Sequence, residues 1–127
     1  VSDCAFTSAK EEFTSVLKTT YHMPAFPLMD LSDRMAKKEA GYGLDECNAR
    51  DEVKKAKIPM LFIHGSKDTF VPCSMVHELY EACAAPKDLL IIEGASHAEA
   101  YYKDRPAYEA AVRKLMERAF TKGVCEE

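Results

Sequence analysis

Two residues whose side chains can together activate a nucleophile stand shortly after two apolar segments of the chain. Asp68 follows the apolar run 58–64 and a short polar loop, and His97 follows the run 89–92 and the loop 94–96. A carboxylate bonded to one ring nitrogen of a histidine orients the ring and stabilises its imidazolium form, which leaves the other nitrogen free to take a proton from a nucleophile. The residues therefore predict an acid and a base of a nucleophilic catalytic site.

The segments before these two residues have the composition of buried parallel strands. Residues 58–64 and 89–92 are nearly unbroken apolar runs, as expected of strands covered on both faces. A helix is predicted over residues 72–84, and consecutive parallel strands joined by one helix usually lie side by side. Ligands of open parallel sheets bind beyond the carboxyl ends of the strands. Asp68 and His97 are therefore expected to meet at one edge of the sheet.

The rest of the chain fits the same architecture. Residues 1–6 are typical of the end of a strand, and residues 8–21 have helical spacing with Thr7 or Ser8 as the capping residue. Within the segment 22–57, which we interpret as an insertion between two strands, a short helix is predicted to end at Gly41. A last helix is expected from about Asp104 to Gly123. Its predicted inward residues are Ala107, Tyr108, Ala111, Val112, Leu115 and Met116. Alternating strands and helices with short loops predict an α/β fold with a parallel sheet.

The strings that carry Asp68 and His97 also resemble segments of a known family. Residues 59–72, PMLFIHGSKDTFVP, resemble the strand and loop that carry the acid in α/β-hydrolases, and residues 94–97, GASH, resemble their histidine loop. An acid followed by the histidine, after a nucleophile earlier in the chain, is the order of that family. Residues 2–7 similarly resemble the end of the strand before the lid. The resemblance covers the whole chain and is closest to the serine esterase and prolyl-oligopeptidase-like group.

This resemblance implies that residues 1–127 are the C-terminal part of an α/β-hydrolase domain. Residues 1–6 would end one strand, residues 22–57 would form a lid-like helical insertion, and residues 58–127 would form the strand-helix-strand-helix unit with the acid and the histidine. It implies hydrolysis of carboxylic esters or related acyl compounds by a Ser-His-Asp triad, without a metal or an organic cofactor. A peptidase or thioesterase of the same fold is one alternative, and a non-catalytic binding module on this scaffold is another.

One part of the family pattern is missing from these residues. The nucleophile of the family lies in a G-x-S-x-G turn, and the strings around Ser66 and Ser96 lack the second glycine. The donors of the oxyanion hole would be missing with it. We therefore expect the nucleophile in an N-terminal half outside residues 1–127, which alone should be inactive. An incomplete sheet edge should also favour self-association.

Several further residues are candidates for contact with the substrate. These candidates are Asp3, Met23, Phe26, Met29 and Phe70. Phe70 stands two residues after Asp68, and Asp3 falls at the end of the first predicted strand. The Met and Phe residues of the insertion suit the apolar wall of an acyl pocket, although packing of the insertion onto the sheet explains them equally well.

Metal binding has little support in the sequence. His64, Asp68 and His97 are legitimate ligand types, but their spacing matches no known zinc motif. His64 ends a buried strand and is predicted to be a structural histidine, hydrogen-bonded near the site. The cysteines are Cys4, Cys47, Cys73, Cys83 and Cys125. Because their number is odd and they lack a C-x-x-C pair, we expect reduced thiols in a cytoplasm-like compartment.

The overall composition argues against several classes of protein. An apolar content of 47% with 30% charged residues is typical of a globular domain. A net charge of −4 without a basic run argues against a nucleic-acid partner. No apolar stretch reaches the roughly 18 residues of a membrane span, and no basic and then apolar stretch at the beginning suggests a signal peptide.

Overall fold

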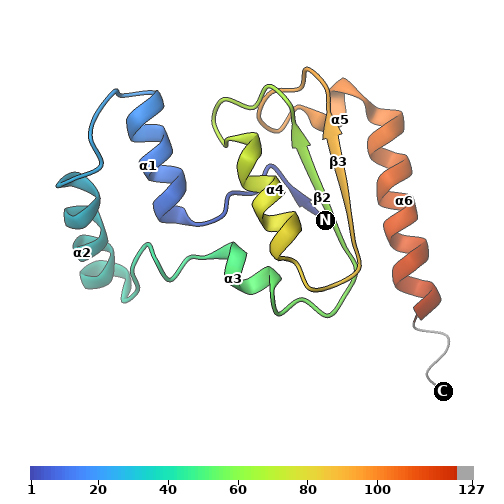
Figure 1. Cartoon of the computed structure of the whole chain (residues 1–127), viewed down its shortest axis with the longest axis horizontal. Helices are drawn as coiled ribbons and strands as arrows, with labels where there is room; N and C mark the ends of the chain where they lie inside the picture. Colours follow the sequence, from blue (N-terminus) through green and yellow to red (C-terminus); the bar gives the residue numbers. More distant parts are fainter. Residues whose placement is uncertain (123–127) are drawn as a thin grey trace.

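Three parallel strands and six helices make up residues 1–122, the part of the chain that the computed structural model describes. In chain order they are β1 (Ser2–Asp3), α1 (Ala9–Thr19), α2 (Leu28–Ala40), α3 (Ala49–Val53), β2 (Met60–Gly65), α4 (Cys73–Ala82), β3 (Lys87–Ile92), α5 (Ala100–Lys103) and α6 (Arg105–Lys122). The strand order is β1-β2-β3, and both neighbouring pairs are parallel (Figure 1). The predicted α/β fold with a parallel sheet flanked by helices is confirmed.

Both faces of the sheet are covered by helices. Phe62 of β2 packs on one side against α3 and α4, together with Leu89 and Ile91 of β3. Leu61 and Ile63 point to the opposite face and pack against α5 and α6. Because successive side chains of a strand alternate between the two faces, a strand covered on both sides must be apolar throughout. This explains the unbroken apolar run that marks β2 in the sequence.

Capping residues mark the ends of the helices between β1 and β2. The Ser8 hydroxyl accepts a hydrogen bond from the backbone N–H of Glu11 at 3.2 Å and caps α1. The side-chain oxygen of Asn48 caps α3 in the same way, accepting from Asp51 N–H at 3.2 Å. α2 ends at Gly41, whose φ of +83° lies in the left-handed region that favours glycine. Of the two predicted capping residues, Thr7 and Ser8, Ser8 is the cap, and the predicted stop at Gly41 is confirmed.

α1 and α2, residues 9–40, form a helical arm on the α4 side of the molecule, away from the sheet (Figure 1). Arg50 of α3 ties this arm to the rest of the molecule. Its guanidinium lies 2.6 Å from the carboxylate of Glu11 on α1 and 2.9 Å from that of Glu78 on α4. The arm and α3 overlap the predicted insertion 22–57, and the role of that segment as a lid stays a prediction.

Two predictions about apolar residues are wrong. Ile58 lies outside β2 and is 74% exposed, because β2 begins only after Pro59, which has no N–H to donate to the ladder. Met116 of α6 was expected to face inward but is about half exposed, whereas Leu115 is buried. Ala111 and Leu115 share the face of α6 that packs on the sheet. Met116 follows Leu115, and the rotation of about 100° per residue turns it away from that face.

Two further sequence expectations concern the thiols and the end of the chain. Cys4, Cys47, Cys73 and Cys83 are all free thiols. Cys125 and the predicted helix end near Gly123 lie outside the described residues. Within residues 1–122, no helix combines the length and the apolar character needed to cross a bilayer.

Candidate active site

Asp68 lies in the loop that follows β2, and the backbone of this loop holds its carboxylate. Oδ1 accepts hydrogen bonds from the N–H groups of Phe70 and Val71, both at 2.9 Å. The residue is only 7% exposed. These two bonds fix the orientation of the carboxylate and leave Oδ2 for another partner.

That partner is His97, in the loop that follows β3. Its Nδ1 lies 2.8 Å from Asp68 Oδ2, while the side chain as a whole is 40% exposed. Since a carboxylate only accepts, the hydrogen bond assigns a proton to Nδ1 and leaves a lone pair on Nε2 of the neutral ring. The structure therefore brings together the two residues that the sequence predicts as acid and base, in the geometry of an oriented general base.

The two loops approach each other closely because residue 65 is glycine. A Cβ at this position would lie 2.3 Å from the carbonyl oxygen of Ala95 and 2.7 Å from that of Ser96. Across the same gap, the N–H of Lys67 donates to the Ala95 carbonyl at 2.9 Å. The contact of backbone with backbone leaves no room for a side chain, and it sets the spacing between the acid loop and the histidine loop.

His64 supports Asp68 from within the core. It is fully buried at the end of β2, and its Nε2 lies 3.0 Å from the carbonyl oxygen of Val71 and 3.4 Å from Asp68 Oδ2. A carbonyl oxygen only accepts, so the proton of the neutral ring is assigned to Nε2. Nδ1 then carries a lone pair and has no hydrogen-bond partner among residues 1–122. This placement fits the structural role predicted for His64.

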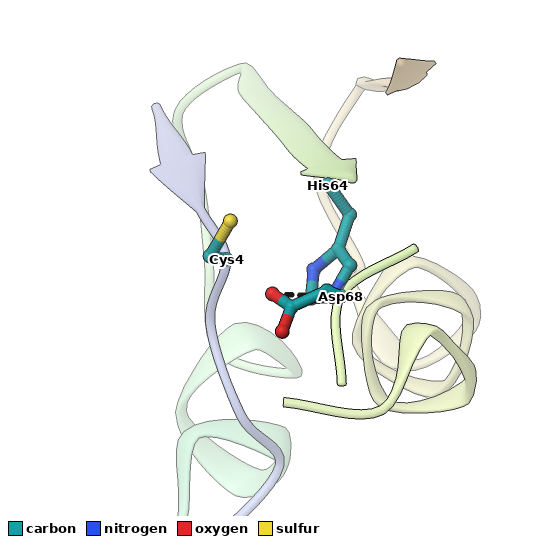
Figure 2. A group of neighbouring side chains, drawn as sticks. All are labelled: Cys4, His64 and Asp68. Atoms are coloured by element: carbon teal, nitrogen blue, oxygen red, sulfur yellow. Dashed lines mark ion pairs between the residues drawn. The ribbon is translucent and has the colours of Figure 1, made fainter. Parts of the chain in front are cut away.

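Cys4, His64 and Asp68 gather into a buried cluster whose potential ligand atoms lie within 4.8 Å of one another, as Figure 2 shows. Burial raises the pKa of the Cys4 thiol to about 11, so the thiol stays protonated near neutral pH. Its sulfur already accepts the N–H of Ala98 at 3.3 Å. Metal binding requires a thiolate and unengaged carboxylate oxygens. The cluster therefore favours packing around the acid over a metal centre.

A cavity of about 280 Å³ opens beside His97, between the two loops and the α1–α2 arm. Apart from His97 itself, its lining consists of Cys4, Phe6, Ala9, Glu12, Phe13, Val16, Phe70 and Val71. The Phe70 ring lies against the imidazole of His97, with 5.0 Å between the ring centroids. The cavity is thus mainly apolar and suits a small apolar part of a ligand next to the imidazole.

The other residues predicted to contact a substrate lie outside this lining. Asp3, at the end of β1, accepts a hydrogen bond from the Tyr108 hydroxyl at 3.1 Å. Met29 is buried between α1 and α2, where it lines a separate cavity. Met23 and Phe26 lie exposed in the connection between these two helices. Of the five candidates, only Phe70 is brought together with His97.

Sequence reasoning missed Glu12, the one acidic residue in the cavity wall. Glu12 is 4% exposed, and both of its carboxylate oxygens are buried without a hydrogen-bond partner among residues 1–122. Burial raises the pKa of its carboxyl, and the nearby Asp68 carboxylate raises it further. The signal that could have revealed it is its position one helical turn before Val16, on the apolar side of the predicted helix.

The similarity to known proteins agrees with this geometry. Residues 4–98 match the family model described as serine hydrolase (FSH1), a span that contains both Asp68 and His97. The chain belongs to the serine hydrolase (FSH1) family.

Two known proteins illustrate how much of such a protein this chain covers. The uncharacterized protein YqkD of Bacillus subtilis (strain 168) is 32% identical over 117 residues, which are 92% of this chain and 38% of YqkD. The chain therefore spans well under half the length of this relative. MGS-MChE2, an alpha/beta hydrolase enzyme from the metagenome of sediments from the lagoon of Mar Chica, Morocco, is similar in structure with a TM-score of 0.51. This similarity, at 15% identity, covers 87% of this chain and 58% of that one. The predicted α/β-hydrolase fold is confirmed.

Proposed function

We propose that residues 1–127 supply the acid and the base of a serine hydrolase that cleaves carboxylic esters or related acyl compounds. The observation that carries this proposal is the 2.8 Å contact between His97 Nδ1 and Asp68 Oδ2. It is supported by the two backbone N–H groups that fix the other oxygen of Asp68. Membership of a serine hydrolase family supports the same reaction class.

In the proposed reaction, His97 moves protons and Asp68 orients it. A serine Oγ attacks the carbonyl carbon of the substrate while its proton passes to His97 Nε2, and a tetrahedral intermediate forms. Asp68 stabilises the resulting imidazolium. His97 then donates that proton to the leaving alcohol oxygen as the C–O bond breaks. Water cleaves the acyl-serine in the same way, giving its proton to His97, which returns it to the serine.

We infer that the serine comes from a segment outside residues 1–127. Within residues 1–122 no serine hydroxyl makes a hydrogen bond with His97, and the whole printed sequence lacks a G-x-S-x-G string. YqkD, of which the matched region is 38%, is long enough to hold further strands and a nucleophile loop. These strands would pair with β1, whose side away from β2 has no strand partner within the described residues.

The free side of β1 also underlies the proposal of self-association. A polypeptide limited to residues 1–127 would keep this strand edge unpaired, and a second copy would be able to pair with it. Sedimentation at increasing concentration should then show species larger than a monomer. A monomer at all concentrations would contradict this proposal without affecting the proposed chemistry.

The apolar cavity is the proposed site of the part of the substrate next to the scissile bond. Phe70 would contact the substrate there because its ring already packs against His97. Met23, Phe26 and Met29 belong to the arm region, and their proposed role as a lid wall requires that region to move toward the cavity. Asp3, held by Tyr108, is proposed to border the pocket at the end of β1.

The test is the intact mass before and after exposure to a fluorophosphonate, a reagent that traps activated serines. A full-length protein containing residues 1–127 should gain one adduct, on a serine outside these residues. The polypeptide 1–127 alone should gain none. A stoichiometric adduct on that shorter polypeptide would contradict the inferred origin of the nucleophile. No adduct on the full-length protein would instead favour a binding module on the hydrolase scaffold.

A further inference from the structure

The cavity beside His97 contains a carboxylate for which the proposed hydrolysis has no use. Glu12 of α1 is one of the residues that line the cavity, and it is as buried as the core residues of the sheet. Neither oxygen has a hydrogen-bond partner within residues 1–122. Buried carboxylates are normally paired, since burial of an unpaired charge is strongly unfavourable. This placement calls for a partner that arrives from outside the described residues.

The charged neighbours of Glu12 are not its partners. Asp68 and His97 both act on its carboxyl through space, but Asp68 carries the same charge. The ring of His97 uses Nδ1 for Asp68 and makes no hydrogen bond with Glu12 among the described residues. Lys10, two residues before Glu12, forms an ion pair with Asp45, and Arg50 forms ion pairs with Glu11 and Glu78.

The other walls of the cavity indicate which kind of ligand would complement Glu12. Phe6, Phe13 and Phe70 contribute three aromatic rings, and the aliphatic residues around them offer no side-chain acceptor. A primary ammonium or a guanidinium brings several N–H donors, of which one carboxylate satisfies only a part. An alkylated ammonium needs no hydrogen bonds. It binds through its charge to a carboxylate and through cation–π contacts to aromatic faces.

We propose that Glu12 and the phenylalanine rings that line the same cavity bind an alkylated ammonium group, which selects substrates that carry such a group near the scissile bond. The selection of substrates rests on the proposed function, because it places the cationic group beside His97. Binding of the group itself does not depend on the nucleophile, so the two proposals can be tested separately.

The first experiment measures binding without chemistry. Tetramethylammonium is titrated into the full-length protein by calorimetry, alongside the variants Glu12→Gln and Glu39→Gln. Glu39 is an exposed acid on α2, 3.7 Å from Lys38, and is not part of the cavity lining, so Glu39→Gln removes the same charge elsewhere. Glu12→Gln should weaken binding about tenfold to a hundredfold, as expected for loss of a desolvated cation partner, and Glu39→Gln should stay within twofold. No saturable binding to the unmodified protein, or equal affinity in Glu12→Gln, overturns the proposal.

The second experiment measures selectivity with isosteric esters that differ only in the charge. One pair is butyrylcholine and 3,3-dimethylbutyl butyrate. In this pair the trimethylammonium group, or the tert-butyl group that replaces it, is on the alcohol side of the ester. The other is the 4-nitrophenyl esters of 4-(trimethylammonio)butanoate and 5,5-dimethylhexanoate, which place it on the acyl side. The unmodified protein should prefer the cationic member of at least one pair in kcat/KM, and Glu12→Gln should lower that preference about tenfold or more. Glu39→Gln, outside the cavity lining, should keep this preference and the rates with both members within threefold of the unmodified protein.

The outcomes separate the two proposals. Equal kcat/KM for both members of both pairs, with active hydrolysis, contradicts the selection while the hydrolase proposal stands. Binding of tetramethylammonium that depends on Glu12, in a protein that cleaves no ester and takes no fluorophosphonate, supports the cation site and contradicts the hydrolase. Phe13→Leu, at a partly exposed position, should also weaken tetramethylammonium binding if the rings take part.

Discussion

The two buried carboxylates beside the cavity are held in opposite ways. Asp68, on the sheet side, engages Oδ1 with the loop backbone and Oδ2 with His97, and the ring of His64 lies nearby. Glu12, on the arm side, is equally buried but has no hydrogen bond from residues 1–122. A carboxylate whose bonds are all internal is fixed for one task, whereas one without internal bonds is available to a ligand. The contrast separates the proposed catalytic machinery from the proposed recognition site.

The same contrast extends to the regions that carry these residues. The sheet side buries its apolar side chains, such as Phe62, between two layers of helices. The arm and its loops instead leave many large apolar side chains exposed. These are Phe13, Tyr21, Met23, Phe26, Leu28, Leu31 and Met35. A segment with fewer buried contacts opens at lower free energy than a packed core. We infer that the sheet side is a stable scaffold that orients the acid and the histidine. The α1–α2 arm, on the other side of the cavity, is more adaptable.

The largest effect should come from Asp68. In Asp68→Asn, the amide no longer accepts reliably from His97 Nδ1–H, so the ring loses its tautomer and orientation. We expect kcat/KM of the full-length protein for an ester to fall by about 10⁴-fold, the size seen for such a change in a serine protease triad. Asp45→Asn, at an exposed residue paired with Lys10, is the control and should stay within twofold. A loss of less than tenfold in Asp68→Asn would show that Asp68 is not the acid.

The two regions should also differ in their contribution to folding. Phe62 is 0% exposed in the core, and Phe26 is 73% exposed in the connection between α1 and α2. Phe62→Ala should lower the free energy of unfolding by about 3–5 kcal/mol through lost burial and a cavity, and Phe26→Ala by less than about 0.5 kcal/mol. Urea unfolding of the full-length protein checks both values. Similar losses in the two variants would mean that the arm is packed in a way that these exposed fractions do not reveal.

What could be predicted from the sequence lies mostly on the sheet side. The apolar runs that end before Asp68 and His97 have a single good explanation, a parallel strand covered on both faces. Once two such strands are adjacent, their loops must meet at one edge. The predicted ends of the strands are less accurate. Ile58 shows this, since an apolar side chain before a proline need not belong to the strand.

The arm side could not be predicted in the same way. Helical spacing shows which residues share a face of α1 but not what that face meets, so the place of Glu12 in the cavity required the structure. Met29, for which the sequence predicts contact with a substrate, lines a separate cavity between α1 and α2, and its contact with a substrate stays a proposal. Amphipathic helices outside a sheet have several surfaces to pack against, and local patterns do not distinguish among them.

A smaller effect is expected from the glycine that sets the distance between the two loops. Gly65→Ala would place a methyl group 2.3 Å from the Ala95 carbonyl oxygen, which has to move. We expect a loss of about 1–3 kcal/mol in stability, typical of overpacking, together with lower activity as His97 shifts from Asp68. Lys67→Ala, at an exposed residue of the same loop, is the control and should change stability by less than about 0.5 kcal/mol. Unchanged activity in Gly65→Ala would mean that the loops tolerate more separation than the geometry indicates.

The smallest effect should be the pH dependence that Glu12 adds to stability. Burial raises the pKa of its carboxyl in the folded protein, with a further contribution from Asp68, so the folded state holds this proton more tightly than the unfolded state. Stability from this group is therefore present at low pH and lost as the pH rises through the ordinary carboxyl range toward the raised pKa. Glu12→Gln removes the titration, so its stability relative to the unmodified protein should be higher at pH 8 than at pH 4 in urea unfolding.

Tetramethylammonium makes this last comparison sharper. A bound cation favours the ionised carboxylate, so a saturating concentration should stabilise the unmodified protein at pH 8 and reduce its difference from Glu12→Gln. The same addition should leave Glu39→Gln as responsive as the unmodified protein, because its cavity keeps the carboxylate. If the difference between pH 4 and pH 8 is absent, Glu12 has a partner in the full-length protein, and the carboxylate on the arm side is then held as firmly as Asp68 on the sheet side.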